Sequence, residues 1–238
     1  MKKNCLIIGA SGDIGVKIAE RLANDGYTLL LHYHQNNRQL EALVSLLPEE
    51  TVLQIVQGDL STTDGINKFL TSIHFDIDTI VFASGRSIYG LFHETDLDEM
   101  DRMLTIHVKA LWMISKHFLP KMITKKDGQI IVISSIWGED GASCEVVYST
   151  VKGAQISFVK SLAKEVASSG ISVNGISPGF IETKMNDGFT LEEKQVIIDQ
   201  IPVNRAGRPE DIAHAVAFLL DDRSSYIQGE ILRISGAW

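Results

Sequence analysis

The sequence is poor in the residues that mark secreted, membrane-spanning or nucleic-acid-binding proteins. Its 238 residues include two cysteines, Cys5 and Cys144, too few for a disulfide framework and too far apart for a metal-binding pair. No apolar run approaches the roughly 18 residues that cross a bilayer. The first apolar run stops at Gly9, too early for a signal peptide. We therefore expect no membrane partner, no metal site and a cytoplasmic location.

Basic residues are also scarce. The 22 Lys and Arg residues face 30 Asp and Glu residues, a formal net charge of −8, which argues against nucleic acid as a partner. Hydrophobic residues make up 45% and charged residues 22%, values typical of a folded globular chain. The length fits one large domain or two small ones. Since no linker, repeat or low-complexity stretch divides it, we expect a single domain over residues 1–238.

Short apolar runs alternate with segments of helical periodicity along the whole chain. Strands are expected at about 3–8, 28–33, 52–57, 79–83, 129–134, 172–176 and 230–234. Helices are expected at about 14–24, 36–47, 61–73, 97–124, 148–168, 191–200 and 209–221. This alternation predicts an α/β fold, a doubly wound (Rossmann) parallel sheet of about seven strands with helices on both faces. The irregular segment 184–205 is expected to be a substrate lid.

A glycine-rich turn separates the first expected strand from the first helix. There the helix N-terminus offers free N–H groups and partial positive charge to a pyrophosphate. Small residues let the backbone approach the phosphates, whereas the alternative is an ordinary turn. The strand–turn–helix context favours a dinucleotide site made by Gly9, Ser11, Gly12, Asp13, Ile14 and Gly15.

The end of the second expected strand indicates which dinucleotide binds. An NAD enzyme usually has an acidic residue there for the ribose 2′-OH, but none lies between Tyr27 and Leu40. His34 and Arg38 are present instead, and Arg38 could bind a 2′-phosphate, so we expect NADP(H). Asp59, with Leu60 beside it, follows the third strand; Asp59 either contacts the adenine or caps the next helix.

Three residues form a candidate catalytic group. Tyr148 and Lys152 are four positions apart on an expected helix, so their side chains share a face. An ammonium about 5 Å from a phenol supplies roughly 3 kcal/mol at an effective dielectric near 20, close to the ~4 kcal/mol that a three-unit fall in pKa requires. Ser135 ends the strand at 129–134, where its hydroxyl could bond a substrate carbonyl. This combination indicates carbonyl chemistry.

With these motifs the chain resembles the short-chain dehydrogenase/reductase family along its whole length, and within it the 3-oxoacyl-acyl carrier protein reductases. The resemblance rests on the glycine turn, Asp59-Leu60, Ser135, Tyr148 with Lys152, the run 173–183, Pro209 to Ala213 and Tyr226 to Gly229. It implies that Tyr148 donates a proton, Ser135 polarises the carbonyl, and Lys152 lowers the tyrosine pKa while binding the nicotinamide ribose. It also implies that Pro178, Gly179, Ile181 and Thr183 hold the carboxamide.

The sequence departs from the family pattern at several positions. Asp13 stands in place of a glycine, so its carboxylate either points away from the pyrophosphate or weakens cofactor binding. Phe82 with Ala83, Ser84 and Gly85 replaces the usual N-N-A-G near the adenosine. His107 aligns with the catalytic asparagine, which is thought to hold a water that links the lysine to solvent. His107 either preserves this relay or only satisfies a helix distortion.

The resemblance suggests two substrates and one rival function. A 3-oxoacyl group on acyl carrier protein needs basic surface near the site, and Lys121, Lys125 and Lys126 offer some. The carboxylates Glu139, Asp140 and Glu145 instead suit an amine-bearing ketone, and residues 143–152 also resemble the elongation factor P 5-aminopentanone reductases, which act on a modified protein lysine. The rival is a non-catalytic NADP-binding regulator. Apolar residues on several faces of the helices at 97–124 and 148–168, which family members pair between subunits, predict a homo-oligomer, a tetramer.

Overall fold

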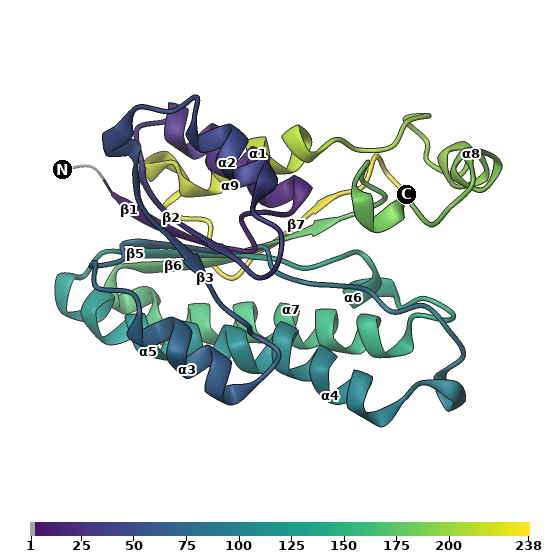
Figure 1. The fold of residues 1–238 in the computed structure, drawn as a ribbon, viewed down its shortest axis with the longest axis horizontal. Coiled ribbons are helices and arrows are strands. Elements are labelled where there is room, and N and C mark those ends of the chain that lie inside the picture. Colours follow the sequence, from purple (N-terminus) through teal and green to yellow (C-terminus); the bar gives the residue numbers. More distant parts are fainter. Residues whose placement is uncertain (1–2) are drawn as a thin grey trace.

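The computed structural model describes residues 3–238 as one parallel sheet between two layers of helices (Figure 1). The seven-stranded sheet has the order β3-β2-β1-β4-β5-β6-β7. Its strands are β1 (Asn4–Ile8), β2 (Thr28–Tyr33), β3 (Val52–Gln57), β4 (Thr79–Phe82), β5 (Gly128–Ile133), β6 (Ile171–Pro178) and β7 (Ile231–Ile234). This confirms the predicted doubly wound fold, and each strand lies within two residues of its expected bounds.

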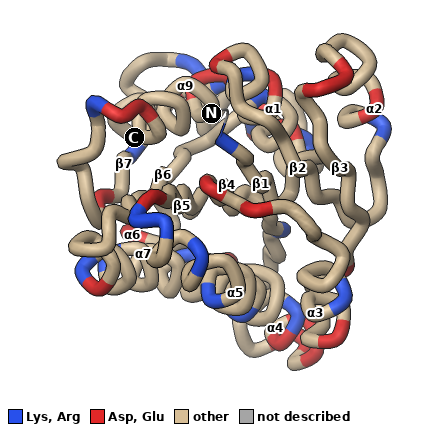
Figure 2. The backbone as a smooth tube through the Cα atoms, turned by 90° about the vertical axis from the view of Figure 1, so that its left-hand side faces the viewer, with Lys and Arg blue, Asp and Glu red and all other residues tan. Residues whose placement is uncertain are grey.

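The helices cover both faces of the sheet. Figure 2 looks along the strands and shows α1, α2 and α9 on one side and α3, α5 and α7 on the other. The helices are α1 (Asp13–Asn24), α2 (Arg38–Val44), α3 (Thr63–Thr71), α4 (Leu97–Leu104), α5 (Ala110–Lys125), α6 (Trp137–Asp140), α7 (Val146–Val166), α8 (Leu191–Asp199) and α9 (Pro209–Leu220). Buried on both faces, the strands carry near-continuous apolar runs such as Leu29 to Leu31.

Two helical features differ from the sequence-based prediction. The helix expected at 97–124 is interrupted by a π-helical segment, Thr105–Lys109, between α4 and α5. The short helix α6, directly after β5, was not predicted at all. Apolar periodicity identifies a helix but does not distinguish a π turn from an α turn, and four residues are too few to show a period.

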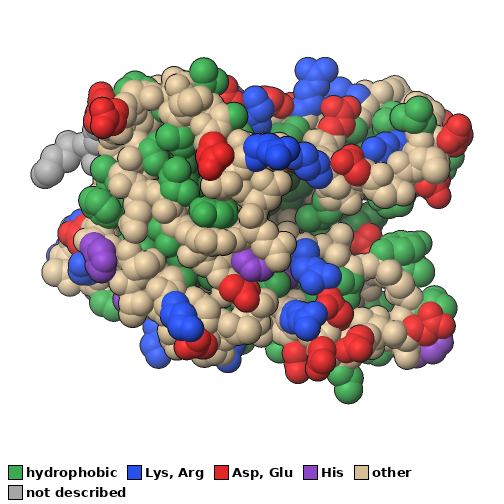
Figure 3. Space-filling view, viewed as in Figure 1, with side chains coloured by type: hydrophobic (Ala, Val, Ile, Leu, Met, Phe, Trp, Pro, Cys, Tyr) green, Lys and Arg blue, Asp and Glu red, His purple; other side chains and the backbone are tan. Residues whose placement is uncertain are grey.

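The chain reverses its direction of winding between β1 and β4, which are neighbours in the sheet although two strands separate them in sequence. Ligands of doubly wound sheets bind beyond the carboxyl ends of the strands at such a reversal. The space-filling view shows the surface hollowed on that side of the molecule, between α8 and the segment before α4 (Figure 3). Among residues 3–238, no helix has the length and apolar character needed to cross a membrane.

Candidate active site

A cleft of about 730 Å³ opens at the carboxyl ends of the strands. Its wall includes the turn before α1, the ends of β2, β4, β5 and β6, the first turns of α7 and the segment between β6 and α8. The volume falls within the 300–1,000 Å³ range of small-molecule and cofactor sites. Ser135, Tyr148 and Lys152 all line it. The fold therefore brings together the three side chains that the sequence singled out as catalytic.

Ser135 is placed by the turn that joins β5 to α6. It is 7% exposed, and its Oγ accepts a hydrogen bond of 3.2 Å from the backbone N–H of Trp137. The Trp137 N–H uses only one lone pair of the Ser135 oxygen, so the hydroxyl can still donate its own proton to another acceptor. The preceding Ser134 donates its hydroxyl to the backbone carbonyl of Lys152 at 2.9 Å and so fixes α7 against β5.

Tyr148 and Lys152 lie on the first two turns of α7. Both are almost fully buried, and the Lys152 Nζ lies 5.6 Å from the centre of the Tyr148 ring. The ammonium donates to the backbone carbonyl of Ile133 at 2.9 Å and to Gln155 Oε1 at 3.2 Å. These bonds hold the charged end of Lys152 inside the cleft wall.

Burial sets the proton affinities of this pair. It lowers the pKa of Lys152 to about 7, because a buried ammonium is poorly solvated. It also raises the pKa of Tyr148 to about 12, an effect that the Ser135 hydroxyl partly opposes. Within the protein itself, burial is therefore the largest influence on the pKa of Tyr148, and it acts against the lowering that the spacing from Lys152 predicts.

His107 lies in the π-helical segment and is fully buried. Its Nε2 is 2.9 Å from the Arg86 carbonyl, so the ring donates there, while Nδ1 has no hydrogen-bond partner among the described residues. Burial lowers the pKa of His107 to about 3, which keeps the ring neutral. Its ring meets that of Tyr148 edge to face at 5.9 Å. The imidazole thus fixes the loop after β4 against Tyr148.

The turn between β1 and α1 has the geometry of a phosphate cradle. Gly9 has a left-handed φ of +79°, and a side chain there would collide with the Ser84 backbone. His32 holds the turn from β2, because its Nδ1 accepts from the Gly9 N–H at 3.0 Å while Nε2 lies 3.1 Å from the Gly58 carbonyl. The first N–H groups of α1 have no partner within the helix and face the cleft side of the turn. An anion fits this position.

Comparison with known proteins agrees with this geometry. A family model described as enoyl-(acyl carrier protein) reductase matches residues 9–237. The chain belongs to the short-chain dehydrogenase/reductase family. The oxidoreductase YmfI of Bacillus subtilis, described as uncharacterised, is 49% identical over 240 residues, which cover 100% of this chain and 99% of that protein.

Two further relatives carry an activity in their names. The 3-oxoacyl-[acyl-carrier-protein] reductase FabG of Rickettsia typhi is 34% identical over 234 residues, 98% of this chain and 95% of that protein. The FabG of Staphylococcus aureus (strain Mu50) is 32% identical over 240 residues, 99% of this chain and 98% of that protein. Membership of the family and the names of these relatives identify the chain as an oxidoreductase.

Most of the cofactor residues expected from the family resemblance line the cleft. They are Ser11, Gly12, Asp13, Ile14, Gly15, His34, Ala83, Ser84, Gly85, Pro178, Gly179, Ile181 and Thr183. Four expected residues, Gly9, Arg38, Asp59 and Leu60, do not line it. Gly9 begins the turn and bonds to His32, Leu60 is buried in the core, and Arg38 is exposed at the start of α2. Asp59 does not cap the next helix either, because Thr62 is the N-cap of α3 and accepts from the Gly65 N–H at 3.0 Å. Asp59 Oδ1 accepts from the Ser61 N–H at 2.8 Å in the turn before α3 and lies 3.8 Å from His34 Nε2.

Asp13 shows how this chain accommodates a departure from the family pattern. Asp13 lines the cleft, and both of its carboxylate oxygens are occupied by other cleft residues. One oxygen accepts from the backbone N–H of Lys184 at 2.7 Å, and the other accepts from Gln39 Nε2 at 2.9 Å. Asp13 therefore ties the turn both to α2 and to the start of the segment 184–205.

Several further cleft residues were not among the expected site residues. Gln35, Asn36, Gln39, Arg86, Ser87, Trp137, Phe180 and Trp238 also line the cleft, as do Lys184, Met185, Asn186, Phe189 and Ile197 from the segment expected to be a lid. Trp238 reaches it from the C-terminus and packs edge to face on Trp137 at 5.1 Å. No local motif marks such residues, because only the folded chain brings them to the cleft. The segment from β6 to α8 was the one part for which irregular sequence gave a signal.

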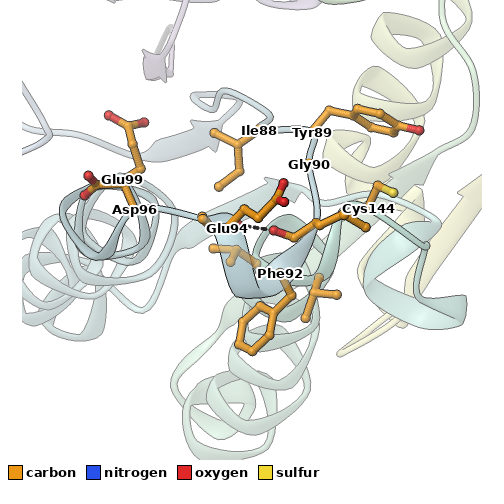
Figure 4. A pocket seen from close by; sticks show the side chains of 12 residues that line it. Ile88, Tyr89, Gly90, Phe92, Glu94, Asp96, Glu99 and Cys144 are labelled. Atoms are coloured by element: carbon orange, nitrogen blue, oxygen red, sulfur yellow. Dashed lines mark hydrogen bonds between the residues drawn. The ribbon is translucent and has the colours of Figure 1, made fainter.

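A second, smaller pocket lies beside the entrance. Figure 4 shows Tyr89 and Cys144 at one end of it and Asp96 and Glu99 at the other. The backbone N–H of Gly90 donates to the Cys144 carbonyl at 2.9 Å, which fastens the loop after β4 to the segment before α7. Cys144 has a left-handed φ of +63° and a free thiol. This pocket holds none of the three catalytic candidates.

Proposed function

We propose that this oxidoreductase reduces a ketone with NADPH, with Tyr148 as the proton donor. The observation that carries the proposal is the convergence of Ser135, Tyr148 and Lys152 in one cleft with the phosphate-binding turn. A hydroxyl, a phenol and an ammonium at the switch point of a doubly wound sheet suit hydride transfer to a carbonyl better than acyl or phosphoryl transfer. The chain offers a proton donor and hydrogen-bond donors there rather than an activated nucleophile.

The cradle before α1 and the residues after β2 would hold the dinucleotide. Among the cleft residues from β2 to α2, namely His34, Gln35, Asn36 and Gln39, none is acidic, which favours a 2′-phosphate over a free ribose hydroxyl. Arg38 begins α2 beside them and is proposed to pair with the phosphate. Bound NADPH supplies the hydride. Pro178, Gly179, Ile181 and Thr183 would hold the carboxamide.

The side chains then have separate tasks. The Ser135 hydroxyl, whose oxygen is already held by Trp137 N–H, donates to the substrate carbonyl oxygen and polarises it. The phenol of Tyr148 is protonated at neutral pH, so it can give this proton to the developing alkoxide. The Lys152 ammonium, held in the wall of the cleft, stabilises the phenolate that remains.

The positions of the charged side chains bear on the substrate. Lys121, Lys125 and Lys126 lie where α5 ends and β5 begins, at the amino-terminal edge of the sheet opposite the cleft, so they do not provide the basic surface expected beside the site. Lys121 also pairs with Asp76 at 2.7 Å and Lys125 with Asp78 at 3.0 Å. A 3-oxoacyl substrate is supported by the names of the FabG relatives, and it remains our first candidate.

Glu145 favours a second candidate, a ketone that bears an amine. Asp140 lies 2.6 Å and Glu139 3.9 Å from the nearest guanidinium nitrogens of Arg233, so both carboxylates share one cation, with Asp140 in the closer pair. Glu145 lines the cleft and has no ion pair within residues 3–238. Burial raises the pKa of Glu145, and a substrate ammonium would compensate its charge. The 5-aminopentanone group on a modified lysine of elongation factor P has this chemistry.

One assay separates the candidates. NADPH absorbance is followed with 3-oxoacyl thioesters, a small amino ketone and a neutral ketone of the same length, for the native chain and Glu145→Gln. If the amine is recognised, the substitution raises KM about tenfold for the amino ketone alone, since one charge-assisted contact is worth about 1.5–3 kcal/mol. Equal effects on both ketones exclude that role for Glu145. No reduction of any substrate by the native chain refutes the proposed function and restores the non-catalytic alternative.

We also propose a homotetramer in the cytoplasm, with residues 184–205 as a lid over the substrate. Leu104 and Trp112 are about half exposed on α4 and α5, as expected of helices that pack against a second subunit. The lid contains α8, whose Leu191 and Val196 are exposed. Both cysteines are free, which fits a reducing compartment. Gel filtration at micromolar concentration tests the tetramer, and elution as a monomer would contradict it.

A further inference from the structure

Gln155 is a fully buried polar side chain on the helix that carries the catalytic pair. It follows Lys152 by three positions, so the two side chains share a face of α7. A buried amide is costly unless its polar atoms are bonded. Gln155 Oε1 accepts from the Lys152 ammonium at 3.2 Å, and Nε2 donates to the backbone carbonyl of His107 at 2.8 Å. The amide therefore links α7 to the π-helical segment through the lysine.

The ammonium of Lys152 has three N–H groups, and two of them are accounted for. They go to the backbone carbonyl of Ile133 and to Gln155 Oε1. Both acceptors are held in place, the first by the β-sheet and the second by its own bond to the His107 carbonyl. Since Lys152 also lines the cleft, these bonds leave the third N–H to the cleft.

Among the described residues, only neutral carbonyl groups, those of Ile133 and Gln155, compensate the positive charge of the buried Lys152 ammonium. Within residues 3–238, no carboxylate forms an ion pair with Lys152. The titratable groups that face it are Tyr148 on its own helix and His107 on the π-helical segment, while β5 contributes only backbone and Ser134. His107 is neutral because burial lowers its pKa to about 3. The two carbonyl oxygens therefore determine how well the ammonium is tolerated.

We propose that Gln155 is a positioning residue, which sets the direction and the charge of Lys152 by bonding it to the His107 carbonyl. This inference rests on the proposed function. It also gives His107 a part in the site that neither sequence-based alternative foresaw. The link to the lysine passes through the backbone carbonyl of His107 and the Gln155 amide, whereas the imidazole holds the loop at Arg86.

Two substitutions should act in opposite directions. Gln155→Leu removes one of the two acceptors, so the pKa of Lys152, already about 7, falls further. Gln155→Glu places a carboxylate against the ammonium and raises that pKa. Turnover requires the charged lysine, so the alkaline limb of the pH profile of kcat should move down by about one pH unit in the first variant and up by about one in the second.

Gln129→Leu is the matched control. Gln129 is another buried glutamine, at the start of β5, and donates to the Leu220 carbonyl at 3.0 Å on the side of the sheet away from the site. Its loss should lower the melting temperature as Gln155→Leu does and leave the pH profile unchanged. A purely structural role for Gln155 predicts the same result for both leucine variants.

A measurement that does not depend on turnover separates this inference from the proposed function. The chain is labelled with ¹³C at the lysine ε-carbons, and the Lys152 signal is assigned by its loss in Lys152→Met. Titration should show the Lys152 pKa falling in Gln155→Leu and rising in Gln155→Glu, whether or not a ketone is reduced. An unchanged Lys152 pKa in both variants, or shifts in the same direction, would overturn the inference.

Discussion

Gly15 offers a sharp test of the glycine turn. A Cβ added there would lie 2.2 Å from the Gly9 carbonyl oxygen and 2.8 Å from Ala10 Cα. Both are backbone atoms, so α1 must move by about 1 Å from the turn before the contact becomes ordinary. Overpacking of this kind costs about 1–3 kcal/mol. We expect Gly15→Ala to lose about 2–3 kcal/mol of unfolding free energy and to bind NADPH at least about tenfold more weakly.

Gly12→Ala supplies the control from the same turn. A Cβ at Gly12 would meet only the Gly9 carbonyl oxygen, at 3.5 Å, and its φ of −74° suits any residue. Its unfolding free energy should change by less than about 0.5 kcal/mol. Urea unfolding and fluorescence titration with NADPH measure both effects. If Gly15→Ala matched Gly12→Ala in stability and affinity, the close contact between turn and helix would not govern cofactor binding.

The remaining predictions concern acid stability, the lid and the core. Burial lowers the pKa of His32 to about 4, so below pH 6.5 the unfolded chain takes up a proton that the folded chain does not. The free energy of unfolding should therefore fall by about 3 kcal/mol between pH 6.5 and pH 4. Urea unfolding curves should show a smaller fall for His32→Gln. Asp13→Ala removes the acceptor of the Lys184 N–H, so trypsin should cut after Lys184 severalfold faster with little change in melting temperature; an unchanged rate would exclude Asp13 as the tie to the lid. Phe82 is fully buried, and Phe82→Ala should cost about 3–5 kcal/mol of unfolding free energy; a loss below about 1 kcal/mol would contradict its place in the core.

Local sequence pattern was enough to predict the architecture. The central strands β1 and β4 are short apolar runs, as at Ile8 before Gly9, and parallel strands buried on both faces are typically of this kind. The π-helical segment around His107 was not predictable, because its register depends on contacts with α7 and with the loop after β4. The periodicity of apolar residues is the same on either side of it.

In the candidate site, too, local sequence pattern predicted some features, whereas others depend on long-range contacts. Tyr148 and Lys152 share a helix face and Ser135 ends a strand, so spacing and topology place them in one cleft. Proton affinity was harder to predict, since the raised pKa of Tyr148 follows from burial that only the folded chain provides. Likewise the role of His32 follows only from the fold, because it is buried at the end of β2 and bonds to Gly9 and Gly58. Contacts between residues far apart in the sequence determine both the pKa of Tyr148 and the partners of His32.

The most direct measurement compares single-turnover ketone reduction by the native chain and by Tyr148→Phe, each saturated with NADPH. The substitution removes one oxygen from a ring whose surroundings stay the same, so NADPH affinity should remain within about twofold. The rate of reduction should fall by about 10²–10⁴-fold, the range attributed to a positioned proton donor. A Tyr148→Phe variant that reduces the ketone at the native rate would contradict the account.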